Sequence, residues 1–136
     1  MISIGGENLI DLVSAAAAAN GLPQYVANPG GSPFNVAMAS GRQGQKVAYL
    51  TPVSEDALGA LLAERLVESK VTLAAGRVPH PTSLAVVSIT DGIPSYAFHR
   101  NGTAERQVTK QALHNDMPAE TKLFHVGSLG LSDGDD

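Results

Sequence analysis

The part of this sequence that most constrains its fold is the stretch 28–37, where a glycine turn leads directly into a helix start. Ser32 is a favourable N-cap residue, and Pro33 suits the first helical position because its φ is already helical and its missing N–H costs nothing there. The Gly30-Gly31 pair carries no Cβ, so a ligand can approach its backbone closely. Asn35 adds a side-chain amide that both donates and accepts hydrogen bonds. The stretch predicts a helix beside a corner suited to a polyhydroxyl ligand, although a Gly-Gly pair by itself is more often a plain tight connection.

An acidic residue, Asp11, interrupts the apolar run Leu9–Val13, which the pattern predicts to be extended. Burying a carboxylate is costly unless it is hydrogen-bonded or contacts a ligand. The pattern alone leaves two interpretations open: an edge-strand acid that faces water, or an acid that binds a ligand.

Two β-rich runs, Leu84–Thr90 and Pro94–Arg100, are joined through Asp91-Gly92, the strongest short hairpin signal in the sequence. The period of two along the second run places two aromatic rings, one of them Phe98, on one face together with Arg100. Such a face suits a sugar pocket, with apolar contact from the rings and hydrogen bonds from the guanidinium. The same pattern is equally typical of a small core or subunit contact with a solvated arginine at the strand end.

The remaining elements alternate between strands and helices, which predicts a parallel sheet with right-handed crossovers. The helix from Pro33 carries an apolar stripe that faces a sheet, and a second helix, capped by Ser54, repeats leucines on one face. The acidic tail 132–136 predicts no regular element. Further strands are predicted at Met1–Gly5, Lys46–Leu50, Val71–Leu73 and Leu123–Val126.

Composition and charge exclude several classes of function. The formal net charge is -4 and Lys and Arg form no block, so nucleic acid and an anionic membrane are not expected partners. The chain has no cysteine and its four histidines lack metal-ligand spacing, which argues against disulfides and zinc sites. No apolar run is long enough to span a bilayer and no basic signal segment precedes the first strand, so we expect a cytoplasmic protein. The motifs of a dinucleotide site and of a phosphate loop are absent.

Taken in order, the stretch 30–37, Gly44 and the segment Leu50–Gly59 resemble the N-terminal signature of the ribokinase-like (PfkB) carbohydrate kinases. The segments Pro81–Val87 and Tyr96–Ala104 are most similar to the fructokinase and 2-keto-3-deoxygluconate kinase branch. The resemblance covers nearly the whole chain but only the first half of such a kinase. It implies an α/β fold: a Rossmann-like parallel sheet flanked by helices, with a small antiparallel β lid, incomplete at its C-terminal side.

The resemblance also implies which parts of the chain form the lid and which residues bind the substrate. Residues 1–136 correspond to the N-terminal part of a ribokinase-like domain, with lid segments at about 9–28 and 84–101. The implied activity is ATP-dependent phosphorylation of a sugar or sugar-acid hydroxyl, with Mg²⁺ on the phosphates. The substrate-binding residues that carry over from the family are Asp11, Gly30, Gly31, Asn35 and Arg100, and the strand pattern adds Phe98 as a further substrate-binding candidate.

The nucleotide site and the catalytic base do not carry over, because the family's Asp-Thr-x-Gly-Ala-Gly-Asp stretch does not occur in this sequence. We therefore expect no catalytic, cofactor-binding or metal-binding residue in this chain, no ATP or Mg²⁺ bound by it alone, and no activity of the chain alone. The alternative function is a non-catalytic sugar-binding or assembly fragment. A sugar, either a fructose-like ketose or a 2-keto-3-deoxy sugar acid, is the expected partner, and the free edges of the lid allow a homodimer through it.

Overall fold

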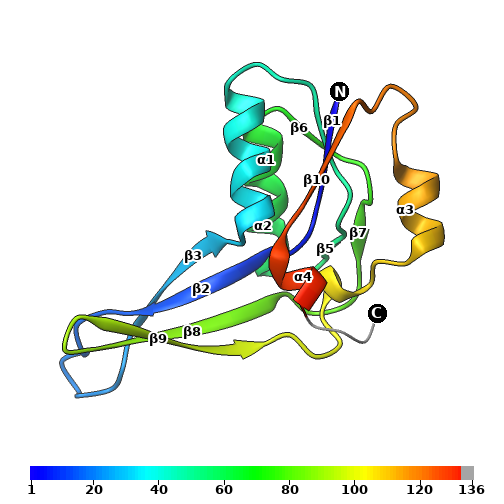
Figure 1. The fold of residues 1–136 in the computed structure, drawn as a ribbon. Coiled ribbons are helices and arrows are strands. Elements are labelled where there is room, and N and C mark those ends of the chain that lie inside the picture. The colour runs from blue at the N-terminus through cyan, green and yellow to red at the C-terminus, as the bar shows by residue number, and fades with distance from the viewer. Residues whose placement is uncertain (133–136) are drawn as a thin grey trace.

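The computed structural model describes residues 1–132 and contains two four-stranded sheets (Figure 1). The main sheet has the order β10 (Leu123–Val126), β1 (Ile2–Gly5), β4 (Val47–Tyr49) and β6 (Val71–Leu73), and all three pairings are parallel. Helices α1 (Ser32–Arg42) and α2 (Ala57–Glu68) pack together on one side of this sheet, and α3 (Lys110–Asp116) lies on the other. The predicted α/β fold with a parallel sheet is therefore confirmed.

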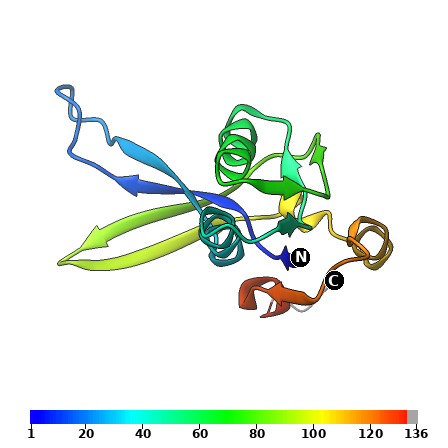
Figure 2. The ribbon, with the colours of Figure 1, turned by 90° about the horizontal axis from the view of Figure 1, so that it is seen from above.

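The second sheet has the order β3 (Tyr25–Gly30), β2 (Leu9–Ser14), β8 (Ser83–Thr90) and β9 (Ile93–His99). It extends away from the main sheet as a long ribbon (Figure 2). The pairs β2–β3 and β8–β9 are antiparallel as predicted, but β2 and β8 run parallel because both leave the main sheet in the same direction. At the tip of the predicted hairpin, Asp91 and Gly92 have φ values of 51° and 77°, as a type I′ turn requires.

Three short elements complete the described part of the chain. Strands β5 (Val53–Ser54) and β7 (Arg77–Val78) form a parallel pair, η1 (Ala104–Arg106) is a 3-10 turn, and α4 (Ser128–Ser132) follows β10 directly. Of the tail expected to lack regular structure, Ser132 ends α4 and residues 133–136 lie outside the described part. Among residues 1–132, no helix has the length and apolar character needed to cross a membrane.

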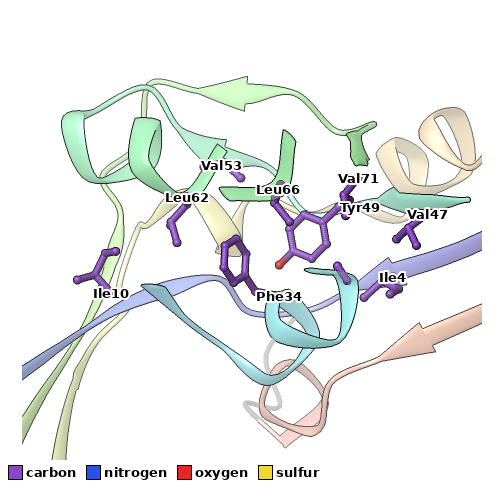
Figure 3. Packing of buried hydrophobic residues seen from close by; sticks show 10 residues of the cluster. Ile4, Ile10, Phe34, Val47, Tyr49, Val53, Leu62, Leu66 and Val71 are labelled. Carbon is purple, nitrogen blue, oxygen red and sulfur yellow. The ribbon is translucent and has the colours of Figure 1, made fainter. Parts of the chain in front are cut away.

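The hydrophobic core lies between the main sheet and helices α1 and α2 (Figure 3). Phe34 of α1 and Tyr49 of β4 meet edge to face, with ring centroids 6.3 Å apart. The Tyr49 hydroxyl donates to the carbonyl of Gly6 over 2.8 Å, and burial raises the pKa of this phenol above its ordinary value, so it remains a neutral donor. The core thus anchors the loop from β1 to β2. The other large members are Ile4, Ile10, Val47, Val53, Leu62, Leu66 and Val71.

Both helix starts differ from the prediction. Gly31 rather than Ser32 is the N-cap of α1, because the N–H of Asn35 bonds to the Gly31 carbonyl over 2.9 Å and draws Ser32 into the first turn. Asp56 rather than Ser54 is the N-cap of α2, and the Ser54 hydroxyl instead accepts a hydrogen bond from the N–H of Asp56. The glycine corner is therefore part of the N-terminus of α1 itself.

Asp56 connects the start of α2 to the segment that enters β8. Its Oδ1 accepts hydrogen bonds from the N–H of Gly59 at 2.7 Å and from the hydroxyl of Thr82 at 2.6 Å, and its Oδ2 accepts from the N–H of Thr82 at 2.8 Å. Partial burial by itself raises the pKa of Asp56, but these hydrogen bonds outweigh it and hold the pKa below its ordinary value.

We expect Asp56→Ala to lower the free energy of unfolding by about 1.5 kcal/mol at neutral pH, because a helix cap and two tertiary hydrogen bonds are lost. Since the folded pKa is depressed, this stabilisation is present above the unfolded pKa of about 3.9 and disappears as the pH falls through the folded pKa. Urea denaturation of wild type and variant from pH 7 to pH 2 checks this. Glu55→Ala, at the exposed neighbouring position, is the control; a difference between wild type and Asp56→Ala that does not shrink in acid would contradict the argument.

Candidate functional site

Asp11, the acidic residue of β2, lies against Gly30 of the neighbouring strand β3. The register places Leu9 opposite Gly30 and Asp11 two residues further along, and a Cβ added at Gly30 would overlap the Oδ2 atom of Asp11. Desolvation raises the pKa of Asp11 above its ordinary value, and no group within residues 1–132 donates a hydrogen bond to its carboxylate. Packing therefore holds this carboxylate in place while its hydrogen-bonding capacity stays available to a ligand.

The corner between β3 and α1 adjoins this carboxylate. Gly31 turns the chain into α1 with a φ of 105°, and a Cβ there would overlap the backbone carbonyl of Glu7. Asn35 follows in the first turn of α1, with its N–H bonded to Gly31 and its side chain exposed. The structure therefore places Gly30, Gly31 and Asn35 in one corner, with Asp11 packed against it.

Phe98 lies on the same face of the second sheet as Asp11. Asp11 is opposite Ala85 in the β2–β8 pair, and Ala85 is opposite Phe98 in the β8–β9 pair, so their side chains emerge on one face. The Phe98 ring stacks on that of Tyr96, with centroids 6.0 Å apart and planes 10° from parallel. The two rings share one face as predicted, and Asp11 lies on that face as well.

Arg100 is buried at the base of the β8–β9 hairpin, with 9% of its surface exposed, and is not a solvated strand end. Its Nε donates to Glu105 Oε1 at 2.6 Å and its Nη2 to Glu105 Oε2 at 3.2 Å. The Ser83 hydroxyl also donates to Glu105 Oε1, at 2.9 Å, and the Thr103 hydroxyl donates to the Arg100 carbonyl. Arg100 and Phe98 both line a cavity of about 740 Å³ between the hairpin base and α4.

The chain matches the family model described as "pfkB family carbohydrate kinase" over residues 2–136. It belongs to the pfkB family. The fructokinase of Rhizobium leguminosarum bv. trifolii is 34% identical to it over 134 residues, which cover 96% of this chain and 40% of that protein. Among solved structures, the fructokinase of Xylella fastidiosa with bound ATP superimposes with a TM-score of 0.86 at 27% identity, covering 98% of this chain and 44% of that one. A sugar kinase of Pyrococcus horikoshii in complex with ATP gives 0.79 at 28% identity, covering 96% and 44%.

These pfkB relatives are considerably longer than the present chain. The chain spans about 40% of the length of the curated fructokinases that it matches, and it corresponds to their N-terminal part. The resemblance to this family and to its fructokinase branch is confirmed.

Two of the solved structures named above contain ATP. A site for a nucleotide and its metal ion would need phosphate-binding groups and metal-ligating side chains in this chain. Within residues 1–132 no group of three or more His, Asp or Glu side chains is placed to hold a metal ion. The sequence also lacks a glycine-rich phosphate loop. Residues 1–132 thus offer no preformed cluster of metal-ligating side chains, and the sequence offers no phosphate loop to fit the nucleotide.

Two buried acids of the pfkB chain were not predicted from its sequence. Glu105 follows the hairpin and fixes Arg100, and the only sequence signal for it is an acid five residues after a basic one. Glu7, 5% exposed, precedes β2, and its Oε2 has no hydrogen-bond partner in the part of the chain that the structure describes. Nothing in the local pattern around Glu7 indicates burial, because the glycines that close over it come from distant segments.

Proposed function

We propose that this chain supplies the sugar-binding part of a fructokinase-like kinase that transfers the γ-phosphoryl group of ATP to a sugar hydroxyl. The observation that carries the proposal is the carboxylate of Asp11, seated on Gly30 beside the start of α1 and without a protein donor within residues 1–132. A carboxylate that keeps its acceptor capacity suits the hydroxyls of a polyol. The membership of the pfkB family and the likeness to fructokinases support it.

In this proposal each site residue has a distinct role. Asp11 accepts hydrogen bonds from sugar hydroxyls, Gly30-Gly31 lets the sugar approach the backbone, and Asn35 donates and accepts at the rim. Phe98 contributes an apolar ring surface, and the second sheet closes over the sugar as a lid formed by segments 9–28 and 84–101. The catalytic base, the anion-stabilising helix N-terminus and the metal-bound nucleotide that the reaction needs are not among these residues. We propose that the protein acts in the cytoplasm.

The ion pair of Arg100 favours a neutral sugar over a sugar acid. Two guanidinium nitrogens already donate to the Glu105 carboxylate, whose negative charge compensates that of Arg100. A compensated cation attracts a substrate carboxylate weakly. We therefore propose a fructose-like ketose as the substrate, with Arg100 at the edge of the site.

Fructose binding to the chain, measured by isothermal titration calorimetry, tests the role of Asp11. We expect Asp11→Asn to weaken binding by at least tenfold, which corresponds to about 1.4 kcal/mol, since an amide cannot replace an ionised acceptor. Because the carboxylate is the acceptor and its pKa is raised, affinity should increase as the pH rises through that pKa. Asp91→Asn, at the exposed hairpin tip and with a residue that tolerates positive φ, is the matched control.

Wild-type affinity in Asp11→Asn would refute the proposed sugar site. An assay of ATP-dependent fructose phosphorylation by the chain alone separates the remaining alternatives. We expect no turnover, and turnover would refute the proposal that the nucleotide site lies elsewhere. Fructose binding without turnover even when the rest of a kinase is supplied would favour a non-catalytic sugar-binding or assembly role.

We also propose that the lid pairs with a second copy of this chain. Strands β3 and β9 are the two edges of the second sheet, and both carry exposed apolar side chains, including Tyr25, Val26 and Ile93. An exposed apolar edge of this length favours association with another chain.

A further inference from the structure

Two Asn-Gly pairs occur in the sequence, Asn20-Gly21 in the loop between β2 and β3 and Asn101-Gly102 directly after β9. They lie at opposite ends of the second sheet (Figure 1). The backbone nitrogen of the residue that follows an asparagine can attack the side-chain amide, and glycine hinders this attack least because it has no Cβ. Asparagine is for this reason a chemically labile residue. Both pairs are exposed to water, so exposure alone does not distinguish them.

Hydrogen bonds hold the first pair, Asn20-Gly21, away from this reaction. The N–H of Gly21 donates to the carbonyl of Ala18 over 2.8 Å, so the attacking nitrogen is already engaged. The Asn20 side-chain oxygen accepts from the N–H of Leu22 over 3.1 Å, which fixes the amide that would be attacked. Both hydrogen bonds oppose the rearrangement by the free energy needed to break them.

The second pair, Asn101-Gly102, lacks both restraints. Within residues 1–132 neither the Asn101 side chain nor the N–H of Gly102 makes a hydrogen bond. Gly102 has a φ of 65°, and no atom lies within 4 Å of the position of a Cβ there. The ends of the turn are held together, because the Thr103 hydroxyl donates to the Arg100 carbonyl over 2.7 Å. The turn therefore keeps the two reacting residues adjacent and leaves both of them unengaged.

We propose that Asn101 is a site of spontaneous deamidation in the folded protein. The Gly102 nitrogen attacks Cγ of Asn101, a new C–N bond forms, and the bond from Cγ to Nδ2 breaks. Nδ2 leaves as ammonia and takes with it the proton that the Gly102 nitrogen loses. Water from the solvent then opens the resulting cyclic imide at one of its two carbonyls and gives aspartate or isoaspartate. No atom changes its oxidation state, so water is the one co-reactant.

Both products change the base of the β8–β9 hairpin. Asn101 lines the same cavity as Arg100 and Arg106, so the new carboxylate enters a site that already contains two guanidinium groups. Isoaspartate also adds a methylene to the main chain inside the turn. That turn is joined to β8, because the Ser83 hydroxyl donates to the Thr103 hydroxyl over 2.7 Å. We therefore expect isoaspartate to loosen the hairpin base, independently of whether the chain binds a sugar.

Peptide mapping by mass spectrometry tests the proposal on the chain incubated at neutral pH. We expect Asn101 to be deamidated at least about fivefold faster than Asn20, because only Asn20-Gly21 must first break hydrogen bonds. In concentrated urea both pairs lose their folded contacts, and the two rates should approach each other. Equal rates in the folded chain, faster deamidation of Asn20, or a rate ratio unchanged by urea would each overturn the proposal.

Variants of the second pair supply the controls. Asn101→Gln lengthens the side chain, and Gly102→Ala places a methyl group on the residue whose nitrogen attacks; both should slow deamidation at this turn and leave Asn20 unaffected. Asn20→Gln, the matched change in the other loop, should leave the rate at Asn101 unchanged. Asn101→Asp introduces the charge without the extra methylene. The purified isoaspartate form should unfold at a lower urea concentration than Asn101→Asp, and equal midpoints would refute the loosening of the hairpin base.

Discussion

Replacing Gly31 by alanine is expected to lower the free energy of unfolding by about 3 to 4 kcal/mol, because two costs add. The residue has a φ of 105°, a conformation that L-amino acids rarely adopt, and the new Cβ would overlap the backbone carbonyl of Glu7. A backbone atom cannot turn aside as a side chain can. Either the β1–β2 loop or the start of α1 must then move.

Gly44→Ala separates the two costs. Gly44 also has a positive φ, of 85°, but no atom lies within 4 Å of the position of its Cβ. This variant therefore carries only the conformational cost, about 1 kcal/mol. Urea denaturation of both variants measures the difference, which we attribute to the contact with Glu7. Equal losses of stability in the two variants would show that the close approach at Gly31 contributes nothing.

The position of Gly31 explains why so short a stretch organises the site. It closes β3 onto the loop that carries Glu7, it caps α1, and its carbonyl receives the N–H of Asn35. The neighbouring Gly30 leaves the space that the Asp11 carboxylate occupies. One glycine therefore sets the backbone of the corner and the other admits the acid, so substitution at either position alters the site as well as the fold.

Local signals in the sequence were sufficient for the elements whose conformation is decided locally. The Asp91-Gly92 pair predicted the hairpin because a type I′ turn needs two residues with positive φ, and both have it. Strand β6 begins and ends at the predicted residues, Val71 and Leu73, with the β-branched pair Val71-Thr72 at its start. The helix caps were displaced because several capping residues compete at each start. Thr82, distant in sequence, holds Asp56 through both carboxylate oxygens and so favours it over Ser54.

Contacts between distant segments could not be predicted in the same way. The parallel pairing of β2 with β8 joins residues more than seventy positions apart, and no turn sets its register. Likewise, strand periodicity placed Arg100 on the aromatic face but gave no sign of its burial against Glu105. The spatial relation of Asp11 to Gly30 was expected only through the family resemblance. The structure adds its physical reason, which is the room left by a missing Cβ.

Removing the Glu105 carboxylate is expected to destabilise the hairpin base strongly. Glu105 and Arg100 pair at 2.6 Å with side-chain exposures of 3% and 8%, and Glu105→Ala leaves a buried guanidinium without its bidentate acceptor. Breaking such a pair costs about 3 to 5 kcal/mol. The matched control is the exposed pair Arg65–Glu68, where Glu68→Ala should cost about 0.5 kcal/mol because water screens the charges.

Urea denaturation of both variants, together with the double variant Arg100→Met/Glu105→Leu, shows where the cost of Glu105→Ala comes from. It comes either from the lost attraction between the two side chains or from the buried guanidinium that remains. If the cost of Glu105→Ala comes from the buried guanidinium that has lost this carboxylate, the double variant should recover most of it, since apolar groups of similar size can replace a buried ion pair. Fructose affinity measured on the same proteins shows whether Arg100 also serves the sugar site. Equal costs for Glu105→Ala and Glu68→Ala would mean that burial does not strengthen this ion pair, and would remove the reason for assigning Arg100 a fixed position beside the cavity.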